Sequence, residues 1–154
     1  MQVEDYFLRE LSFKVNEEYD SEKPEDTSGA IQYMIEVRQH KDDPHKWQCI
    51  LGVRSNPEER VNSPYTFTII LEGYFEVDPK VSEEEEREKL VNANTPALLY
   101  TIAREILSST SARARWGRIN LPTVYFPAVT SAKKVKKPAA KRVTSTKKKQ
   151  RAAK

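Results

Sequence analysis

The recurrence of apolar residues at every second position in three consecutive segments is the feature that most constrains this chain. In residues 30–38, the apolar side chains that share one face are Ile31, Tyr33, Ile35 and Val37. Residues 47–54 repeat the pattern with Trp47, Cys49, Leu51 and Val53, and residues 65–77 extend it from Tyr65 to Val77. A period of two over this length is typical of half-buried β-strands.

An earlier segment, residues 6–15, adds a fourth strand with a defect in its pattern. Phe7, Leu11, Phe13 and Val15 share one parity, but Leu8 and Arg9 interrupt it. A β-bulge near Arg9 restores the alternation, because one extra residue shifts the side-chain parity. Four successive strands without intervening helices predict an antiparallel meander with one face covered and one face in water.

The pattern changes to a helical one after residue 81. Ser82 and Glu85 have the spacing of a capping box, which predicts a short polar helix that ends near residues 91–94. Thr95 is then expected to cap a second, longer helix with Pro96 in its first turn. The apolar stripe of this second helix consists of Leu98, Leu99, Ile102, Ala103, Ile106 and Leu107.

These elements predict an α+β fold, in which a four-stranded antiparallel sheet is covered by one short and one long helix. An apolar sheet face requires a covering layer, and the longer helix supplies an apolar stripe of matching character. Burial of each large aliphatic side chain in that stripe is worth roughly 1.5–3 kcal/mol before entropy.

Charge divides the chain into two parts, which we interpret as a folded domain, residues 1–130, and a disordered tail, residues 131–154. The tail holds eleven of the 26 Lys and Arg residues and no Asp or Glu, so fifteen basic and 23 acidic residues remain elsewhere, a net charge of −8. A basic tail of this kind can neutralise nucleic-acid phosphates without reading bases. The candidate phosphate contacts are Lys133, Lys134, Lys136, Lys137, Lys141, Arg142, Lys147, Lys148 and Lys149. The alternatives are a solubilising extension and a segment that folds back on the acidic body.

No pattern in the sequence indicates catalysis. His40 and His45 flank an expected turn, Cys49 lies among apolar strand residues, and four scattered glycines cannot form a phosphate-binding loop. We therefore expect no enzyme activity, no cofactor and no metal site. One cysteine, no signal-peptide pattern and no apolar run of bilayer length predict a cytoplasmic protein without membrane insertion.

Two segments in the last third of the predicted domain carry a family resemblance. Residues 95–108, TPALLYTIAREILS, and residues 119–126, INLPTVYF, are similar to consecutive motifs of the SecB family of export chaperones. Residues 9–15 and 71–77 resemble the first and fourth strands of that family. The resemblance covers roughly residues 3–128, in matching order and spacing.

The resemblance implies a four-stranded antiparallel sheet backed by helices, assembled into a homotetramer or dimer. Such proteins bind unfolded or nascent polypeptides in apolar grooves without ATP and pass them to the SecA motor, while related solitary chaperones hold antitoxins. This chain departs from the family pattern at Thr101 and Ile102, in the loop at residues 111–117, and after Phe126. The last departure affects part of the contact with SecA.

We therefore expect an ATP-independent holdase, which requires apolar surface kept in solution by charge. The candidate client contacts are Tyr6, Phe7, Leu8, Tyr74, Phe75, Trp116, Tyr125 and Phe126. The candidate partner-docking residues, on an acidic sheet face, are Glu10, Glu72 and Glu76. The structural alternatives are core packing or a subunit interface for the client candidates, and an ordinary solvent-exposed sheet face for the acidic residues. A nucleic-acid-associated oligomeric module and an antitoxin chaperone are the functional alternatives.

Overall fold

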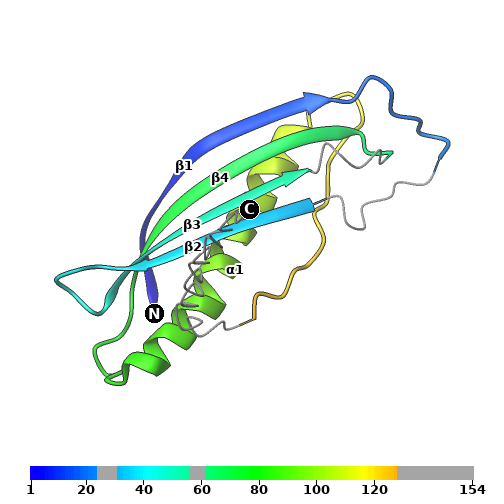
Figure 1. Cartoon of the computed structure of the whole chain (residues 1–154). Coiled ribbons are helices and arrows are strands. Elements are labelled where there is room, and N and C mark those ends of the chain that lie inside the picture. The colour runs from blue at the N-terminus through cyan, green and yellow to red at the C-terminus, as the bar shows by residue number, and fades with distance from the viewer. Residues whose placement is uncertain (24–30, 56–61, 128–154) are drawn as a thin grey trace, which may run out of the picture.

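The computed structural model describes residues 1–23, 31–55 and 62–127, which form one sheet and one long helix (Figure 1). Residues 131–154, which the sequence assigns to the tail, lie outside the described residues. The elements, in chain order, are β1 (Gln2–Val15), β2 (Ile31–Gln39), β3 (Lys46–Ser55), β4 (Tyr65–Glu76) and α1 (Glu84–Ser111). The four predicted strands are thus present at nearly the expected positions, and the α+β fold class is confirmed.

The order of strands in the sheet is β1-β4-β3-β2, with every neighbouring pair antiparallel. β2, β3 and β4 form the expected meander. β1 pairs with β4 rather than with β2, so the prediction of a four-stranded meander is wrong for the first strand. Alternation specifies which side of a strand is apolar but not which strand lies next to it, because side-chain parity is a local property.

The bulge predicted near Arg9 is confirmed by the pairing of β1 with β4. Leu8 lies opposite Leu71 and Glu10 lies opposite Ile70, so Arg9 is the extra residue. A bulge reverses the parity of the residues on one side of it. As a consequence Leu8, and not Phe7, shares the helix-side face with the second half of the strand.

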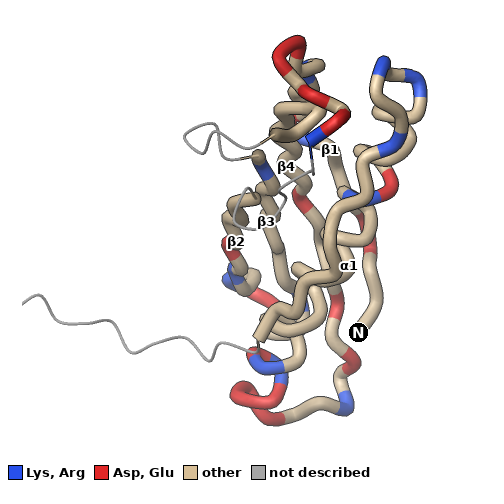
Figure 2. The backbone as a smooth tube through the Cα atoms, turned by 90° about the vertical axis from the view of Figure 1, so that its right-hand side faces the viewer, with Lys and Arg blue, Asp and Glu red and all other residues tan. Residues whose placement is uncertain are grey.

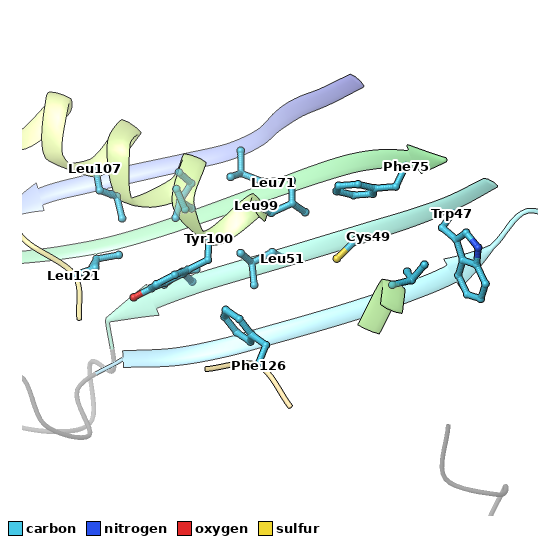
Figure 3. Close-up of a cluster of buried hydrophobic side chains, with 14 of the residues drawn as sticks. Trp47, Cys49, Leu51, Leu71, Phe75, Leu99, Tyr100, Leu107, Leu121 and Phe126 are labelled. Atoms are coloured by element: carbon cyan, nitrogen blue, oxygen red, sulfur yellow. The ribbon is translucent and has the colours of Figure 1, made fainter. Parts of the chain in front are cut away.

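The helix-side face of β3 and β4 forms the centre of the hydrophobic core. Cys49, Leu51, Ile69, Leu71 and Phe75 are among its fully buried side chains, as the alternation predicted. Figure 3 shows Cys49, Leu51, Leu71 and Phe75 around Leu99 of α1. Burial of one parity on both central strands follows from the covering helix, which contacts β3, β4 and, less extensively, β2.

One helix of 28 residues replaces the two that the sequence predicts. Its N-cap is Glu83, without a side-chain capping bond, so the capping box of Ser82 and Glu85 is wrong. Thr95 lies inside the helix, where its Oγ1 donates to the Val91 carbonyl at 3.0 Å. Pro96 costs the helix one backbone bond, yet the helix continues, because side chains on both sides of Pro96, such as Val91 and Leu99, are buried against the sheet.

The apolar stripe of α1 faces the sheet, with one exception. Leu99, Ala103 and Leu107 are fully buried, and Ile102 and Ile106 are partly buried against the core. Leu98, expected in the same stripe, is 40% exposed on the flank of the helix. The stripe that contacts the sheet is therefore narrower than the sequence indicates.

Residues 119–127 follow α1 as an extended segment without regular secondary structure, which we call the strap. Two prolines, Pro122 and Pro127, account for its failure to form a helix. The strap runs back beside α1 toward β2 (Figure 1). Leu121 and Phe126 insert into the core cluster, so the strap forms part of the covering layer.

Candidate functional site

An uncovered apolar strip lies along the helix-side face of β1, and we call it the open β1 face. Cross-strand partners share a face of a sheet, and the partners of these residues on β4 are core residues or Gly73. The side chains of the open β1 face are Val3, Tyr6, Leu8, Leu11 and Val15, which are between 39% and 48% exposed.

The open β1 face exists because α1 does not extend across the whole sheet. The helix contacts the other three strands, whereas no close contact joins it to β1. The same side of β4, one strand inward, is fully buried at Ile69 and Leu71. An apolar strip of this kind beside a core, on an edge strand, is typical of a protein-binding surface.

A hollow of about 410 Å³ lies between the start of the chain and the flank of α1. It is lined by Met1, Leu98, Ala97 and other residues of the helix. Exposed Leu98 therefore faces the side of the molecule on which β1 begins. The hollow provides a wall of partly apolar character next to the first residues of the open β1 face.

The structure separates the eight candidate client contacts into different environments. Tyr6 and Leu8 lie on the open β1 face, whereas Phe7 and Tyr74 lie on the outer face, where their rings contact edge to face at 6.2 Å. Phe75 is fully buried and Phe126 is 7% exposed, both in the core cluster. Of these six residues, Tyr6 and Leu8 are therefore the two that belong to the open β1 face.

Trp116 and Tyr125 occupy two further environments. The Trp116 backbone N–H donates to Tyr65 Oη at 2.9 Å, and its ring contacts Tyr19 edge to face. Tyr65 Oη in turn donates to the Gly117 carbonyl at 2.7 Å, which fixes the turn where Gly117 has a φ of 80°. Trp116 thus anchors a loop. Tyr125 is 85% exposed on the strap, between partly buried Val124 and buried Phe126.

Sequence reasoning missed three members of the open β1 face, Val3, Leu11 and Val15. For Leu11 and Val15 the available signal was the shift of parity at Arg9, which places residues before and after the bulge on one face. Val3 lies on this face because of a second register shift, between Val3 and Asp5. The sequence could not show that α1 leaves the edge strand β1 uncovered, because this depends on the strand order and on where α1 lies.

The three candidate docking acids lie together on the outer face of the sheet. Glu10 and Glu76 flank the more central Glu72, which accepts a hydrogen bond from Tyr74 Oη at 2.6 Å. Glu72 also accepts one from Gln48 and forms an ion pair with Arg9 at 3.4 Å. These contacts, the bond from Tyr74 first, lower the pKa of Glu72, and the same bond raises the pKa of Tyr74.

Acidic residues outside the sheet gather at the start of α1, at the lower end of the molecule in Figure 2. Glu84, Glu85 and Glu86 occupy the first turn, where negative side chains complement the helix dipole. Lys89 pairs with Glu85 at 2.7 Å, one turn along the helix. This cluster therefore has a structural explanation in helix stability.

Cys49 is a buried structural thiol, as its position in the alternation predicted. It has no exposed surface, and burial raises its pKa to about 11. A thiol with such a pKa carries almost no nucleophilic thiolate at neutral pH.

Among the described residues, no group of three His, Cys, Asp or Glu side chains could hold a metal ion.

Two histidines flank the hairpin between β2 and β3 in different environments. His40 is exposed, and its Nδ1 accepts a hydrogen bond from the Asp42 backbone N–H at 3.2 Å. His45 is partly buried, and its Nδ1 lies buried without a hydrogen-bond partner in the described part of the chain. Only His45 is therefore less solvated than a turn position suggests. Within the described segments, no helix is long and apolar enough to cross a membrane.

A family model described as SecB, preprotein translocase subunit SecB, matches residues 1–137. No match is found among curated proteins. The matched range includes every described strand, the helix and the strap, and it extends beyond the interval of the resemblance noted in the sequence.

Solved structures of similar arrangement have low sequence identity to the chain. A SecB-like chaperone of Mycobacterium tuberculosis, in complex with a ChAD peptide from the HigA1 antitoxin, is 16% identical with a TM-score of 0.47. The likeness covers 82% of this chain and 91% of that one. A Streptococcus agalactiae protein of unknown function is 12% identical with a TM-score of 0.44, over 79% of this chain and 96% of that one.

Proposed function

Because the chain belongs to the SecB family, we propose that it is an ATP-independent holdase that binds unfolded or nascent polypeptides on the open β1 face. Proteins of this family are chaperones and not enzymes, which agrees with the expectation from the sequence. The description of the family as a translocase subunit supports a role in protein export, which we include in the proposal.

The observation that carries the proposal is the exposure of five apolar side chains on one face of β1. The hydrophobic effect is non-directional and depends on the apolar area removed from water. A strip of aliphatic and aromatic side chains can therefore accept many unrelated sequences, provided that they are unfolded and expose apolar residues. Edge strand β1 also presents unpaired backbone groups, which an extended client can use.

A homo-oligomer is part of the proposal, and it requires apolar surface other than the client site. The flank of α1 offers Leu98, 40% exposed, and the hollow beside it. We propose that subunits associate through this flank and leave Tyr6 and Leu8 accessible. Size-exclusion chromatography with light scattering measures the mass, and a strict monomer contradicts this part.

The export role requires docking to the SecA motor, for which we propose the outer face of the sheet. Glu10 is the exposed acid of the three, whereas Glu72 and Glu76 are partly buried and Glu72 is held by its contacts with Tyr74, Gln48 and Arg9. A charge-reversal variant at Glu10 is expected to weaken binding to SecA while client binding persists. Unchanged SecA binding would remove Glu10 from this role.

The experiment that tests the holdase compares two faces of the same strand. Tyr6→Thr and Leu8→Thr, combined, remove apolar surface from the open β1 face, whereas Phe7→Thr changes the neighbouring residue on the outer face. Threonine has high strand propensity, so the exposed substitutions keep β1 intact. Stoichiometric protein is added to an aggregating, chemically reduced client, and light scattering is followed.

We expect the unaltered chain and Phe7→Thr to delay aggregation and the double variant to lose most of this activity. If no form delays aggregation, the holdase proposal fails. If Phe7→Thr alone loses activity, the client surface is the outer face. If the double variant changes the oligomer mass, the open β1 face is a subunit interface, contrary to the proposal.

A second candidate function is nucleic-acid contact through residues 131–154, which lie outside the described residues. The segregation of charge favours it, because eleven Lys and Arg lie in a segment without acids beside a body of net charge −8. Binding to mixed DNA in a gel shift should fall steeply with salt and disappear when residues 131–154 are deleted. Absence of a shift at low salt removes this candidate.

The antitoxin-chaperone hypothesis stays a prediction, which a neighbouring toxin–antitoxin gene pair would favour.

A further inference from the structure

The strap contacts the body of the protein in the way that an unfolded apolar polypeptide would. Leu121 and Phe126 insert into the core cluster, while Tyr125, next to Phe126, is 85% exposed. Ile119 and Val124 are partly buried against the same cluster. The strap is thus an extended segment held mainly by individual side chains that enter an apolar surface.

Few backbone hydrogen bonds hold the strap in place. Among the described residues, Tyr100 Oη donates to the Pro122 carbonyl at 2.6 Å, and the Ile119 N–H donates to Ser111 Oγ at 2.9 Å. The strap belongs to no strand pair, since the sheet consists of β1 to β4 alone. Attachment through a few side chains, one carbonyl and one backbone N–H does not depend on the rest of the strap sequence, so another chain can replace it.

The surface beneath Phe126 is aromatic and continues into exposed apolar residues. The Phe126 ring lies 5.7 Å from that of Tyr100 on α1 and 6.2 Å from that of Tyr33 on β2, both in edge-to-face geometry (Figure 3 shows Tyr100 and Phe126). Tyr33 is 36% exposed, and Ile35, two residues along the same face of β2, is 44% exposed. An incoming polypeptide therefore meets accessible apolar side chains directly beside the strap.

We propose that the strap is a displaceable internal occupant of a second client-binding surface, between α1 and β2, and that clients compete with it. The occupant that replaces it is an extended client segment with an aromatic residue in the place of Phe126 and aliphatic residues near it. The client first contacts Tyr33 and Ile35 and then takes the contact of Phe126 with Tyr100. This inference rests on the proposed holdase function and adds a means of regulating client affinity.

Competition of this kind lowers the apparent affinity for clients by the fraction of molecules in which the strap is released. If the strap is released in about a tenth of the molecules, the apparent affinity is about tenfold below the intrinsic one. Weakening the strap should therefore tighten client binding, the opposite of what removal of an ordinary contact residue does.

The test compares Phe126→Ala with Tyr125→Ala in the full chain. Both remove an aromatic ring from the strap, but only Phe126 is buried against Tyr100 and Tyr33. Affinity for a fluorescently labelled, permanently unfolded protein is measured by anisotropy, and circular dichroism checks that each variant is folded. We expect Phe126→Ala to bind about five- to tenfold more tightly and Tyr125→Ala to bind as the unaltered chain does.

A synthetic peptide of residues 119–127 provides a second measurement. It should displace the labelled client from Phe126→Ala, whereas the same peptide with Ala in place of Phe126 should not. If Phe126→Ala does not fold, Tyr100→Phe takes its place, because it removes the bond that holds the Pro122 carbonyl and keeps the aromatic ring, and tighter binding is again expected. Unchanged or weaker binding by a folded strap variant, or no competition by the peptide, overturns the inference. Failure of every form to bind client refutes the holdase proposal instead.

Discussion

Gly73 on β4 is the position where the approach of α1 to the sheet can be tested by a single methyl group. A Cβ built at Gly73 would lie 2.8 Å from Phe75 Cε2 and 2.9 Å from Leu99 Cδ2. Both of those side chains are fully buried, so neither has free space into which it can move. Gly73→Ala must therefore displace the helix or distort packed rotamers.

The expected loss of stability follows from two opposing contributions. Overpacking a dense core costs about 1–3 kcal/mol, whereas replacing a strand glycine by alanine recovers about 0.5–1 kcal/mol of chain entropy. We therefore predict that Gly73→Ala lowers the free energy of unfolding by about 1–2 kcal/mol, because overpacking outweighs the gain in chain entropy.

Gly52→Ala on β3 is the matched control. The nearest atom to its Cβ would be Met34 Cε at 3.2 Å, and Met34 is 52% exposed on the outer face. The end of this flexible side chain can move into solvent, so Gly52→Ala should be within about 0.5 kcal/mol of the unaltered chain or more stable.

Urea unfolding followed by circular dichroism at a fixed protein concentration provides the measurement. With a slope of about 2 kcal/mol/M, the midpoint of Gly73→Ala should fall by roughly 0.5–1 M urea without a change in slope. A midpoint equal to that of the unaltered chain, or a larger loss in Gly52→Ala, would refute the close packing of α1 on Gly73.

Three further predictions follow from the described contacts. Cys49, with no exposed surface and a pKa raised to about 11, should react with a thiol reagent only as the protein unfolds, in a time course that parallels unfolding. Tyr65→Phe should destabilise the fold by about 1–3 kcal/mol and change Trp116 fluorescence, because it leaves the Trp116 N–H and Gly117 carbonyl without their shared partner. The hydrogen bond from Tyr74 lowers the pKa of Glu72 below its ordinary 4.5. The ionised carboxylate of Glu72 therefore stabilises the fold above about pH 4.5, and this contribution is lost as the pH falls through the lowered pKa. Glu72→Gln should consequently lose less stability than the unaltered chain between about pH 5 and pH 3, measured by urea unfolding at each pH.

Much of the sheet could be predicted from the sequence because alternation is recorded in every strand. Residues of one parity on β3 and β4, including Cys49, are buried as expected, and the irregular parity at Arg9 correctly indicated a bulge. The two-helix prediction failed because Thr95 and Pro96 have the local chemistry of a helix start. Buried contacts of Val91 and Leu99 on either side of Pro96 outweigh that local preference.

The candidate site was only partly predictable for the same reason. The sequence indicated Tyr6 and Leu8 but grouped them with Phe7, Phe75 and Phe126, which the structure places on the outer face or in the core. Aromatic residues contribute to a core, an interface or a binding surface with similar chemistry. Only their surroundings in three dimensions distinguish these roles.

The sequence by itself determined which face of each strand is apolar, where β1 is bulged, that a helix follows the sheet, and that charge is unequally distributed along the chain. The tertiary structure decided that β1 pairs with β4, that α1 runs unbroken past Pro96, and that Phe126 packs against Tyr33 of β2 while the helix-side face of β1 keeps an exposed apolar strip. Periodicity is a property of neighbouring residues, so it fixes the direction of each side chain. Which surface lies against it depends on contacts between residues far apart in the chain, and these form only when the whole fold is assembled.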